Sequence, residues 1–310
     1  MSVMNRAVVL GGSGFIGGRL VKALVEQGYE TVSVDQRPPR FPLGISSDRY
    51  QFAQGELFDP DFIDSLLAPG DLVFHLASVS LPETSNQNML QDLTATVGLT
   101  IFLLERCARA RIRKAIFLSS GGTVYGVNAG CSITEDHATE PLSAYGIGKL
   151  TCEKYLGLFR QLFGMDHTIL RVANAYGERQ DPFGRQGIIA VVLGKIFRGQ
   201  PVEIWGDGNV VRDFVHVDDV VRACLLAAAT DTEHRVFNIG TNTGVSLNGL
   251  LDEIRTTLGA QFEVRYAPAR AFDVPRVVLD YTRARQDLGW SPGVSLGEGL
   301  KGYWQWLQRM

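Results

Sequence analysis

Short apolar runs alternate with amphipathic stretches along the first part of the chain. Residues 7–10 are continuously apolar, which is typical of a buried strand, and 15–27 place apolar side chains at helical spacing. The same alternation predicts strands at 30–34, 50–53, 72–76, 114–118 and 167–172, and helices at about 90–110 and 143–163. Strands that alternate with helices indicate a parallel sheet. We therefore expect an α/β fold built on a doubly wound parallel sheet.

The alternation weakens beyond residue 172. A loop rich in glycine, arginine and aspartate (177–186) precedes a predicted helix at 187–198, a short strand at 202–205 and a turn at 206–209. A helix at 218–229 and a strand at 236–239 follow, and the remainder mixes short elements. We expect one domain over 1–174, with 212–240 interleaved, and a smaller α/β lobe over 175–211 and 241–310.

Composition and charge narrow the classes of function. Of the 310 residues, 45% are hydrophobic and 20% are charged, which is ordinary for a globular protein. A formal net charge of -3 argues against nucleic acid or a membrane surface as a partner, so an anionic ligand needs local positive charge. The chain has no apolar run of membrane-spanning length and no pattern of a secretion signal near its start. We expect a cytoplasmic protein.

The cysteines give no sign of a metal site. Cys107, Cys131, Cys152 and Cys224 form no CxxC pair, and no cysteine–histidine cluster has the spacing of zinc ligands. We therefore expect no metal and interpret the four cysteines as buried free thiols.

A glycine-rich turn joins the first predicted strand to the first helix. Gly11, Gly14 and Gly17 have G-x-x-G-x-x-G spacing, with Phe15 and Ile16 between the last two. Glycine lets the backbone turn tightly and approach a pyrophosphate, which the free N–H groups of a helix N-terminus attract. An ordinary structural turn is the alternative, but the strand–turn–helix context favours the dinucleotide-binding pattern of a Rossmann domain.

Further residues at strand ends fit the same cofactor. Asp35 ends the second strand, where its carboxylate can accept both ribose hydroxyls and repel a 2′-phosphate, which favours NAD over NADP. Arg37 is a mild argument for NADP. Glu56, followed by Leu57 after the third strand, is placed to meet the adenine amine. Leu76, Ala77 and Ser78 end the fourth strand, at the sheet edge where such ligands bind.

Tyr145 and Lys149 carry the predicted chemistry. They lie at i and i+4 near the start of a helix and share one face. A free phenol has a pKa of about 10 and is a poor base at neutral pH, but a nearby ammonium and a positively charged nicotinamide ring favour the phenolate. Tyr145 is then suited to accept a proton. Such pairs are often surface accidents, and the dinucleotide pattern upstream is what makes this one significant.

A third catalytic group is expected from the strand end at residues 119–126. Ser119, Ser120 and Thr123 are the candidate hydroxyls to hydrogen-bond the reacting oxygen, with Ser119 also placed to contact the cofactor. The alternative is that these hydroxyls only satisfy backbone groups.

The motifs together resemble the extended short-chain dehydrogenases/reductases, and within them the nucleotide-sugar epimerases of the UDP-glucose 4-epimerase type. The matching stretches are GGSGFIG (11–17), GELFD (55–59), HLAS (75–78), SSGGTVYG (119–126), YGIGK (145–149), LRVANAYG (170–177), GDGNVVRDFVHVDDVV (206–221), FNIGT (237–241), DVP (273–275) and LGW (288–290). The resemblance covers nearly the whole chain. It implies bound NAD, a UDP-sugar substrate and a transient 4-keto sugar. It also implies a homodimer formed through the helices at about 90–110 and 143–163, with Leu99, Phe102 and Leu103, or Leu156 and Phe159, as possible contact residues.

The resemblance also assigns a substrate site. Arg212 and Arg270 match arginines that contact the diphosphate, and Asn174 matches an asparagine that contacts phosphate or sugar. The segments that enclose the uracil match Gly187 and Ile188, and Glu203 and Trp205. The alternatives are that Arg212 pairs with Asp213 or Asp218 and that Trp205 belongs to the core.

Two departures from the family pattern bear on the substrate. Val277 stands where relatives that exclude N-acetylated sugars carry a bulky tyrosine, which implies room for an acetamido group. Gly121 stands where many relatives carry the active serine, so Ser120 is the first choice for that role and Thr123 the second.

The expected function is therefore C4 epimerisation of UDP-N-acetylglucosamine and UDP-N-acetylgalactosamine, and of UDP-glucose and UDP-galactose as a second possibility. A 4-keto-sugar reductase would need the same catalytic residues and stays an alternative. A 4,6-dehydratase would require an Asp-Glu pair where this chain has Gly121 and Gly122. A non-catalytic dinucleotide sensor is disfavoured because Tyr145 and Lys149 are both present.

Overall fold

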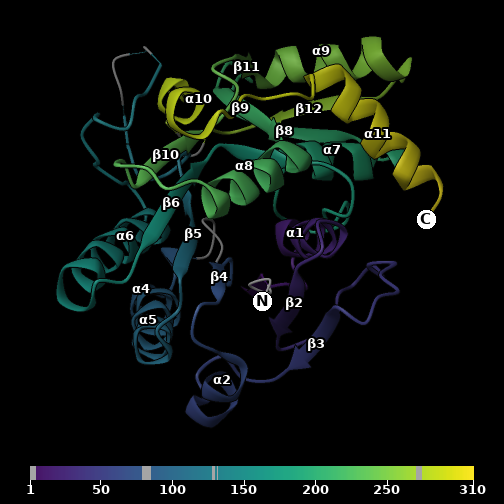
Figure 1. Ribbon diagram of the computed structural model, residues 1–310. Helices are drawn as coiled ribbons and strands as arrows, with labels where there is room; N and C mark the ends of the chain where they lie inside the picture. Colours follow the sequence, from purple (N-terminus) through teal and green to yellow (C-terminus); the bar gives the residue numbers. More distant parts are fainter. Residues whose placement is uncertain (1–4, 79–84, 128–129, 131, 270–273) are drawn as a thin grey trace.

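A seven-stranded parallel sheet forms the centre of the protein (Figure 1). The computed structural model describes residues 5–78, 85–127, 130, 132–269 and 274–310. From one edge to the other, the strands are β10 (Val236–Ile239), β6 (His167–Val172), β5 (Lys114–Ser120), β4 (Leu72–His75), β1 (Arg6–Leu10), β2 (Glu30–Asp35) and β3 (Tyr50–Gln54). The predicted α/β fold with a doubly wound parallel sheet is confirmed.

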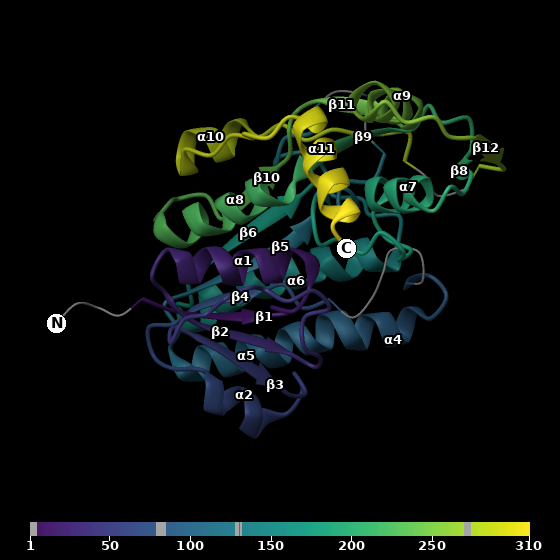
Figure 2. The same cartoon turned by 90° about the vertical axis from the view of Figure 1, so that its right-hand side faces the viewer.

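Helices cover both faces of this sheet, and each face has its own apolar core (Figure 2). One face carries α1 (Phe15–Glu26), α8 (Val217–Ala229) and α10 (Thr282–Leu288); the other carries α2 (Pro60–Leu66), α5 (Leu99–Ala110) and α6 (Ala144–Phe163). The inner strands β1 and β4 are buried on both sides, which explains why their sequences are almost continuously apolar.

The helix expected at 90–110 contains a local irregularity. It consists of α4 (Met89–Leu93), a π-helical turn at Thr94–Gly98 and then α5. Helix α6 has regular ends: the Ser143 hydroxyl accepts a hydrogen bond from the Gly146 N–H, and Gly164 ends the helix in the left-handed conformation. The short helix α2, whose first turn is capped by Asp59, was not predicted.

The residues expected to form a dimer contact lie inside the core of the single chain. Leu99, Leu103, Leu156 and Phe159 are buried in the core beneath the sheet, and Phe102 packs against them. Their apolar character therefore reflects packing within one chain. The homodimer itself stays a prediction.

A second lobe contains two small sheets. Strand β9 (Val211–His216) lies between β11 (Gly244–Ser246) and β13 (Arg276–Val277) and also pairs with β7 (Asn174–Tyr176), while β8 (Val202–Trp205) pairs with β12 (Val264–Ala267). Helices α7 (Ile188–Phe197), α9 (Leu247–Leu258) and α11 (Leu296–Gln308) pack around a separate apolar core. Figure 2 shows this lobe at one end of the first sheet.

The chain crosses between the two parts more often than the expected domain limits suggest. Strand β10 and helix α8 belong to the first sheet and its layers, whereas β9, at the start of the interleaved segment 212–240, belongs to the second lobe. Helix α10, expected in the lobe, packs against the first sheet. The domain limits themselves stay a prediction.

Other sequence expectations have clear outcomes in the described residues. Cys107, Cys152 and Cys224 are buried free thiols, while Cys131 lies outside the described part of the chain. Among the helices that the structure describes, none combines the length and apolar character that crossing a membrane requires.

Two buried histidines make the fold sensitive to acid. His75, at the end of β4, lies 3.0 Å from the Thr100 hydroxyl, and burial together with Lys149 lowers its pKa to about 3. Burial lowers the pKa of His167 to about 4. Unfolded histidines titrate near 6.5, so below that pH the unfolded chain binds protons that the folded chain does not.

We therefore predict that the free energy of unfolding is highest above pH 6.5 and falls as the pH drops towards 4. Each histidine contributes a slope of up to about 1.4 kcal/mol per pH unit. Urea unfolding between pH 7.5 and 4.5 measures this pH dependence of the free energy of unfolding. His75→Gln should reduce the slope, whereas the exposed His234→Gln serves as a control; an unchanged slope in His75→Gln would contradict the prediction.

Candidate active site

A cavity of about 990 Å³ lies where the first sheet meets the second lobe. Its wall includes the glycine turn, the ends of β4 and β5, the start of α6 and the α7 side of the lobe. The sequence-predicted residues that line it are Gly11, Gly14, Phe15, Ile16, Gly17, Leu76, Ser78, Ser119, Ser120, Thr123, Tyr145, Lys149, Asn174, Gly187, Ile188, Glu203, Trp205 and Arg212. Residues more than 200 positions apart in sequence therefore face one space.

The glycine turn needs glycine at two positions for different reasons. Gly11 has φ +86°, and a Cβ there would lie 2.7 Å from the Ala77 nitrogen. A Cβ on Gly17 would lie 2.1 Å from the Gly11 carbonyl oxygen, because α1 packs directly on the turn. No side chain caps the N-terminus of α1 after Gly14. Its N–H groups are thus available to an anion.

Four predicted cofactor residues do not line the cavity. The Asp35 carboxylate accepts a hydrogen bond from the Ser13 N–H at 3.1 Å, so it lies beside the glycine turn. Glu56 accepts a hydrogen bond from the Gln36 side chain at 2.8 Å. Leu57 is buried in the core, and Ala77 packs against that core with its backbone close to Gly11. The side chain of Leu57 is therefore structural.

Lys149 is held rigidly at the base of the cavity. The side chain is buried, and Nζ donates to the Leu118 carbonyl oxygen at 3.0 Å and lies 4.8 Å from the centre of the Phe117 ring. Burial lowers the pKa of Lys149. The ammonium is 5.8 Å from the centre of the Tyr145 ring, on the same face of α6 as predicted.

The pKa of Tyr145 is raised in the protein without a nicotinamide ring beside it. Burial, followed by the negative charge of Asp92, raises the pKa of Tyr145 to about 12. The Lys149 ammonium is directed at the Leu118 carbonyl oxygen, and one Asp92 oxygen is buried without a hydrogen-bond partner among the residues that the structure describes. A positively charged group in the cavity is needed to offset these effects.

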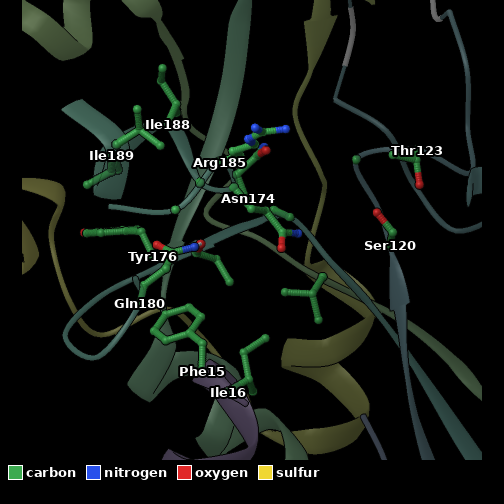
Figure 3. Close-up of a pocket in the computed structure, with 18 of the residues that line it drawn as sticks. Phe15, Ile16, Ser120, Thr123, Asn174, Tyr176, Gln180, Arg185, Ile188 and Ile189 are labelled. Carbon is green, nitrogen blue, oxygen red and sulfur yellow. Dashed lines mark hydrogen bonds between the residues drawn. The ribbon is translucent and has the colours of Figure 1, made fainter. Parts of the chain in front are cut away.

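The three candidate hydroxyls differ in their surroundings. Ser119 is buried and donates to Glu153 Oε1 at 2.5 Å, so its side chain has a structural partner. Ser120 and Thr123 line the cavity on the side opposite Arg185 and Ile188 (Figure 3). The Thr123 hydroxyl oxygen is buried and has no hydrogen-bond partner among the described residues, which is an unfavourable state for a buried polar atom.

Gly121 cannot be exchanged for the family's serine without rearrangement. A Cβ at this position would lie 2.4 Å from Leu279 Cδ1 and 3.0 Å from the Arg171 carbonyl oxygen. Leu279 and the β6 backbone at Arg171 therefore pack directly against this glycine.

The substrate-lobe residues surround the other half of the cavity. Asn174 donates from its amide nitrogen to the Asp213 carbonyl oxygen at 3.0 Å, and Figure 3 shows it between the two walls. Arg212 donates to the carbonyl oxygen of Val274 at 2.7 Å. Asp213 instead bonds Thr241, and Asp218 bonds Arg19, so the expected alternative partners of Arg212 are engaged elsewhere.

Trp205 lines this cavity, whereas Val277 does not. Trp205 is 41% exposed and lines it with Glu203, so the core alternative for Trp205 is wrong. Val277 lies beside Arg212 in the paired strands, but it is only 3% exposed and packs against Val124 and Tyr125. This position gives no support for the predicted direct contact of Val277 with substrate. Arg270 lies outside the described residues.

Comparison with known proteins places this arrangement in a family. Residues 7–240 match the NAD dependent epimerase/dehydratase family. The chain belongs to that family. The resemblance to extended short-chain dehydrogenases/reductases, the expectation of an enzyme and the choice of NAD as cofactor are thereby confirmed.

Individual relatives cover almost the full chain. The UDP-glucose 4-epimerase of Mycolicibacterium smegmatis is 36% identical over 301 residues, covering 95% of this chain and 96% of that protein. The crystal structure of UDP-glucose 4-epimerase from Thermotoga maritima with UDP-glucose has a TM-score of 0.92 and 38% identity, covering 98% and 99%. The UDP-N-acetylglucosamine 4-epimerase from Methanobrevibacter ruminantium, in complex with UDP-N-acetylmuramic acid, has a TM-score of 0.92 and 28% identity, covering 99% of each chain.

The described residues fit the family's cofactor. The close backbone approach at Gly11 and Gly17, and the uncapped start of α1, form a cradle that a Cβ would fill. Asp35 ends β2 beside this cradle, where the ribose of a dinucleotide is expected.

Sequence reasoning missed several charged and polar residues of the cavity. Arg179, Gln180 and Arg185 lie on the loop between β7 and α7, Lys195 on α7, and Arg40 on the loop after β2. The enrichment of glycine, arginine and aspartate at 177–186 was the available signal, although it assigned no role to any residue.

The cavity is cationic even though the chain is weakly acidic. Among the described lining residues, the basic ones are Arg40, Lys149, Arg179, Arg185, Lys195 and Arg212, and the acidic ones are Asp181 and Glu203. This local excess is the positive charge that two diphosphate-containing ligands would require.

We predict that Gly17→Ala abolishes NAD binding, because its Cβ must displace the Gly11 carbonyl and open the cradle. Gly157→Ala on α6 is the matched control: nothing lies within 4 Å of its Cβ position, and alanine should stabilise the helix by roughly 0.5–1 kcal/mol. Calorimetric titration with NAD and thermal unfolding check both effects. Wild-type NAD affinity in Gly17→Ala would refute the cradle.

Proposed function

We propose that the protein is an NAD-dependent UDP-sugar 4-epimerase that interconverts the C4 epimers through a transient 4-keto sugar. The observation that carries this proposal is the shared cavity: Tyr145, Lys149 and Thr123 line the same space as the glycine cradle and the basic residues of the second lobe. The named relatives and their bound UDP-sugars support the substrate class.

The chain's own residues divide the chemistry among them. NAD, when bound, supplies a hydride acceptor and a positive charge that favours the Tyr145 phenolate. Tyr145 takes the proton of the sugar 4-hydroxyl and later returns it to the oxygen on C4, once the sugar has turned so that C4 is reduced from its opposite face. Lys149 holds its ammonium beneath this pair, fixed by the Leu118 carbonyl oxygen.

A second group must hydrogen-bond the sugar oxygen during proton transfer. Ser120 and Thr123 are both candidates, and the Thr123 oxygen, which has no hydrogen-bond partner among the described residues, supports the latter. Arg212 and Asn174, across the cavity, would anchor the diphosphate while the 4-keto sugar rotates to present its other face. An anchored intermediate keeps the reacting atoms at high effective concentration between the two hydride transfers.

For the sugar, we propose the N-acetylated pair, UDP-N-acetylglucosamine and UDP-N-acetylgalactosamine, with UDP-glucose and UDP-galactose as further substrates. Val277 supports this indirectly: its small side chain is enclosed by Val124 and Tyr125, so nothing from this position extends into the cavity. A tyrosine is too large for that enclosure and would project beyond it. The solved UDP-N-acetylglucosamine 4-epimerase of the same fold gives further support.

We predict that Tyr145→Phe lowers kcat by about 10²–10⁴-fold while NAD stays bound, because only the proton acceptor is lost. Epimerisation is followed by NMR of the sugar anomeric signals, and bound NAD by absorbance after denaturation. Tyr155→Phe on the same helix, which packs against the core, is the control.

The same assay separates epimerase from reductase. An epimerase forms product without added NADH or NADPH, because the hydride returns to the sugar. Reduction of a supplied UDP-4-keto sugar in proportion to added NADH or NADPH, without epimerisation of the UDP-sugar, would instead establish the 4-keto-sugar reductase. Nearly full activity of Tyr145→Phe would remove Tyr145 from the mechanism.

We predict that Val277→Tyr reduces kcat/KM for UDP-N-acetylglucosamine at least about tenfold more than for UDP-glucose, because the relatives that exclude N-acetylated sugars carry a tyrosine at the matching position. Val277→Ala is the control for disturbance of the surrounding cluster and should preserve the substrate ratio. Turnover of UDP-glucose by the wild-type enzyme with none of UDP-N-acetylglucosamine would refute the proposed substrate.

A further inference from the structure

The loop between β2 and β3 reaches from the first sheet to the second lobe. The Arg179 guanidinium donates to the Pro42 carbonyl oxygen at 2.8 Å and also to that of Phe41. Arg40 forms an ion pair with Asp181. The Phe41 ring meets Trp306 of α11 edge to face, with centroids 5.1 Å apart. Three independent contacts thus join residues 40–42 to the lobe.

The other side of the same loop is attached to the first domain. Leu43 is buried in the core that includes Leu20 and Val21 of α1. A Cβ on Gly18 of α1 would lie only 2.9 Å from Leu43 Cδ2. Residues 40–43 therefore span the gap between the helix that begins at the glycine cradle and the substrate lobe.

Arg179, the residue of the lobe that binds this loop, is held in place by its neighbours. Arg179 has φ +75°, a conformation that a non-glycine residue adopts only where its surroundings enforce it. Next to it, Glu178 lies 3.5 Å from His216 Nε2 and within 3.9 Å of Arg19. On its other side, the Gln180 carbonyl oxygen accepts a hydrogen bond from the Tyr303 hydroxyl at 2.6 Å.

These contacts lie at the wall of the cofactor cavity. Arg40, Phe41 and Arg179 line the same space as Gly11, Gly14 and Gly17. Trp306, which holds Phe41 in place, is not among the lining residues. A bound dinucleotide would thus lie behind residues 40–42. One of the residues that hold this loop, Trp306, lies outside the cavity wall.

We propose that residues 40–43, held by Arg179, Asp181 and Trp306, form a clasp that retains NAD between turnovers. Release of the cofactor requires these contacts to separate, so each of them slows dissociation. Retention suits a reaction in which the cofactor must return the hydride it has accepted. The inference rests on NAD as the family's cofactor and is independent of which sugar the enzyme uses.

The test measures cofactor release directly. The holoenzyme is loaded with NADH, mixed with excess NAD, and the loss of bound NADH fluorescence gives the dissociation rate. Trp306→Leu should raise this rate about three- to tenfold by removing the aromatic contact, and Arg179→Asn about tenfold or more by removing two charge-assisted hydrogen bonds. Asparagine suits this position because it tolerates the left-handed conformation.

Matched controls separate the clasp from general damage. Trp304→Leu alters the same helix at a ring that packs on Phe197, and Arg49→Ala alters the same loop at a side chain that bonds the Gly28 carbonyl oxygen. Both should release NADH within about twofold of the wild-type rate. Thermal unfolding establishes that each variant is folded.

The decisive comparison is between Trp306 and the lining residues. If Trp306→Leu releases NADH at the wild-type rate, the clasp is overturned, and faster release from Arg179→Asn would then reflect a direct contact with the cofactor. Arg40→Ala is an exposed substitution that preserves the fold, so a wild-type rate in that variant also overturns the proposal. These rates do not depend on epimerase activity.

Discussion

The buried ion pair between Arg171 and Glu153 fixes the geometry on which the site depends. Arg171, on β6, bonds the Glu153 carboxylate of α6 at 2.7 Å and the Tyr125 hydroxyl at 2.8 Å, while Ser119 of β5 donates to the same carboxylate. Loss of one partner in such a pair typically costs about 3–5 kcal/mol because the other charge stays buried. Since Glu153 lies one turn beyond Lys149, this pair sets how α6 presents Tyr145 and Lys149 to the strand ends.

The cavity is formed by two parts that contribute different chemistry. The first sheet supplies a rigid cradle and the Tyr145–Lys149 pair, and the second lobe supplies Arg212, Arg185 and Asn174. Because burial and Asp92 keep the Tyr145 phenol protonated in the protein alone, its activation depends on what else enters the cavity. In the proposed mechanism, the positive charge of bound NAD would offset these effects and so couple proton acceptance to hydride acceptance.

Local patterns predicted the elements well and individual contacts less well. The strand–turn–helix pattern at 6–26 located the cradle, because glycine spacing reports on backbone geometry that is decided within a few residues. The roles of Leu57, Leu99 and Val277 could not be resolved in the same way, because an apolar side chain suits both a core and a ligand wall. The π-helical turn at Thr94–Gly98 likewise has no marker in the hydrophobic pattern.

The sequence by itself determined the α/β class, the glycine cradle and the i, i+4 placement of Tyr145 and Lys149, since each depends on short-range periodicity and backbone sterics. Only the tertiary structure decided that the Ser119 hydroxyl is taken by Glu153, that Tyr145 has a raised pKa, and that Arg179 joins the loop after β2 to the lobe. These outcomes depend on contacts between residues 34 to 138 positions apart, whose distances and burial no local pattern encodes.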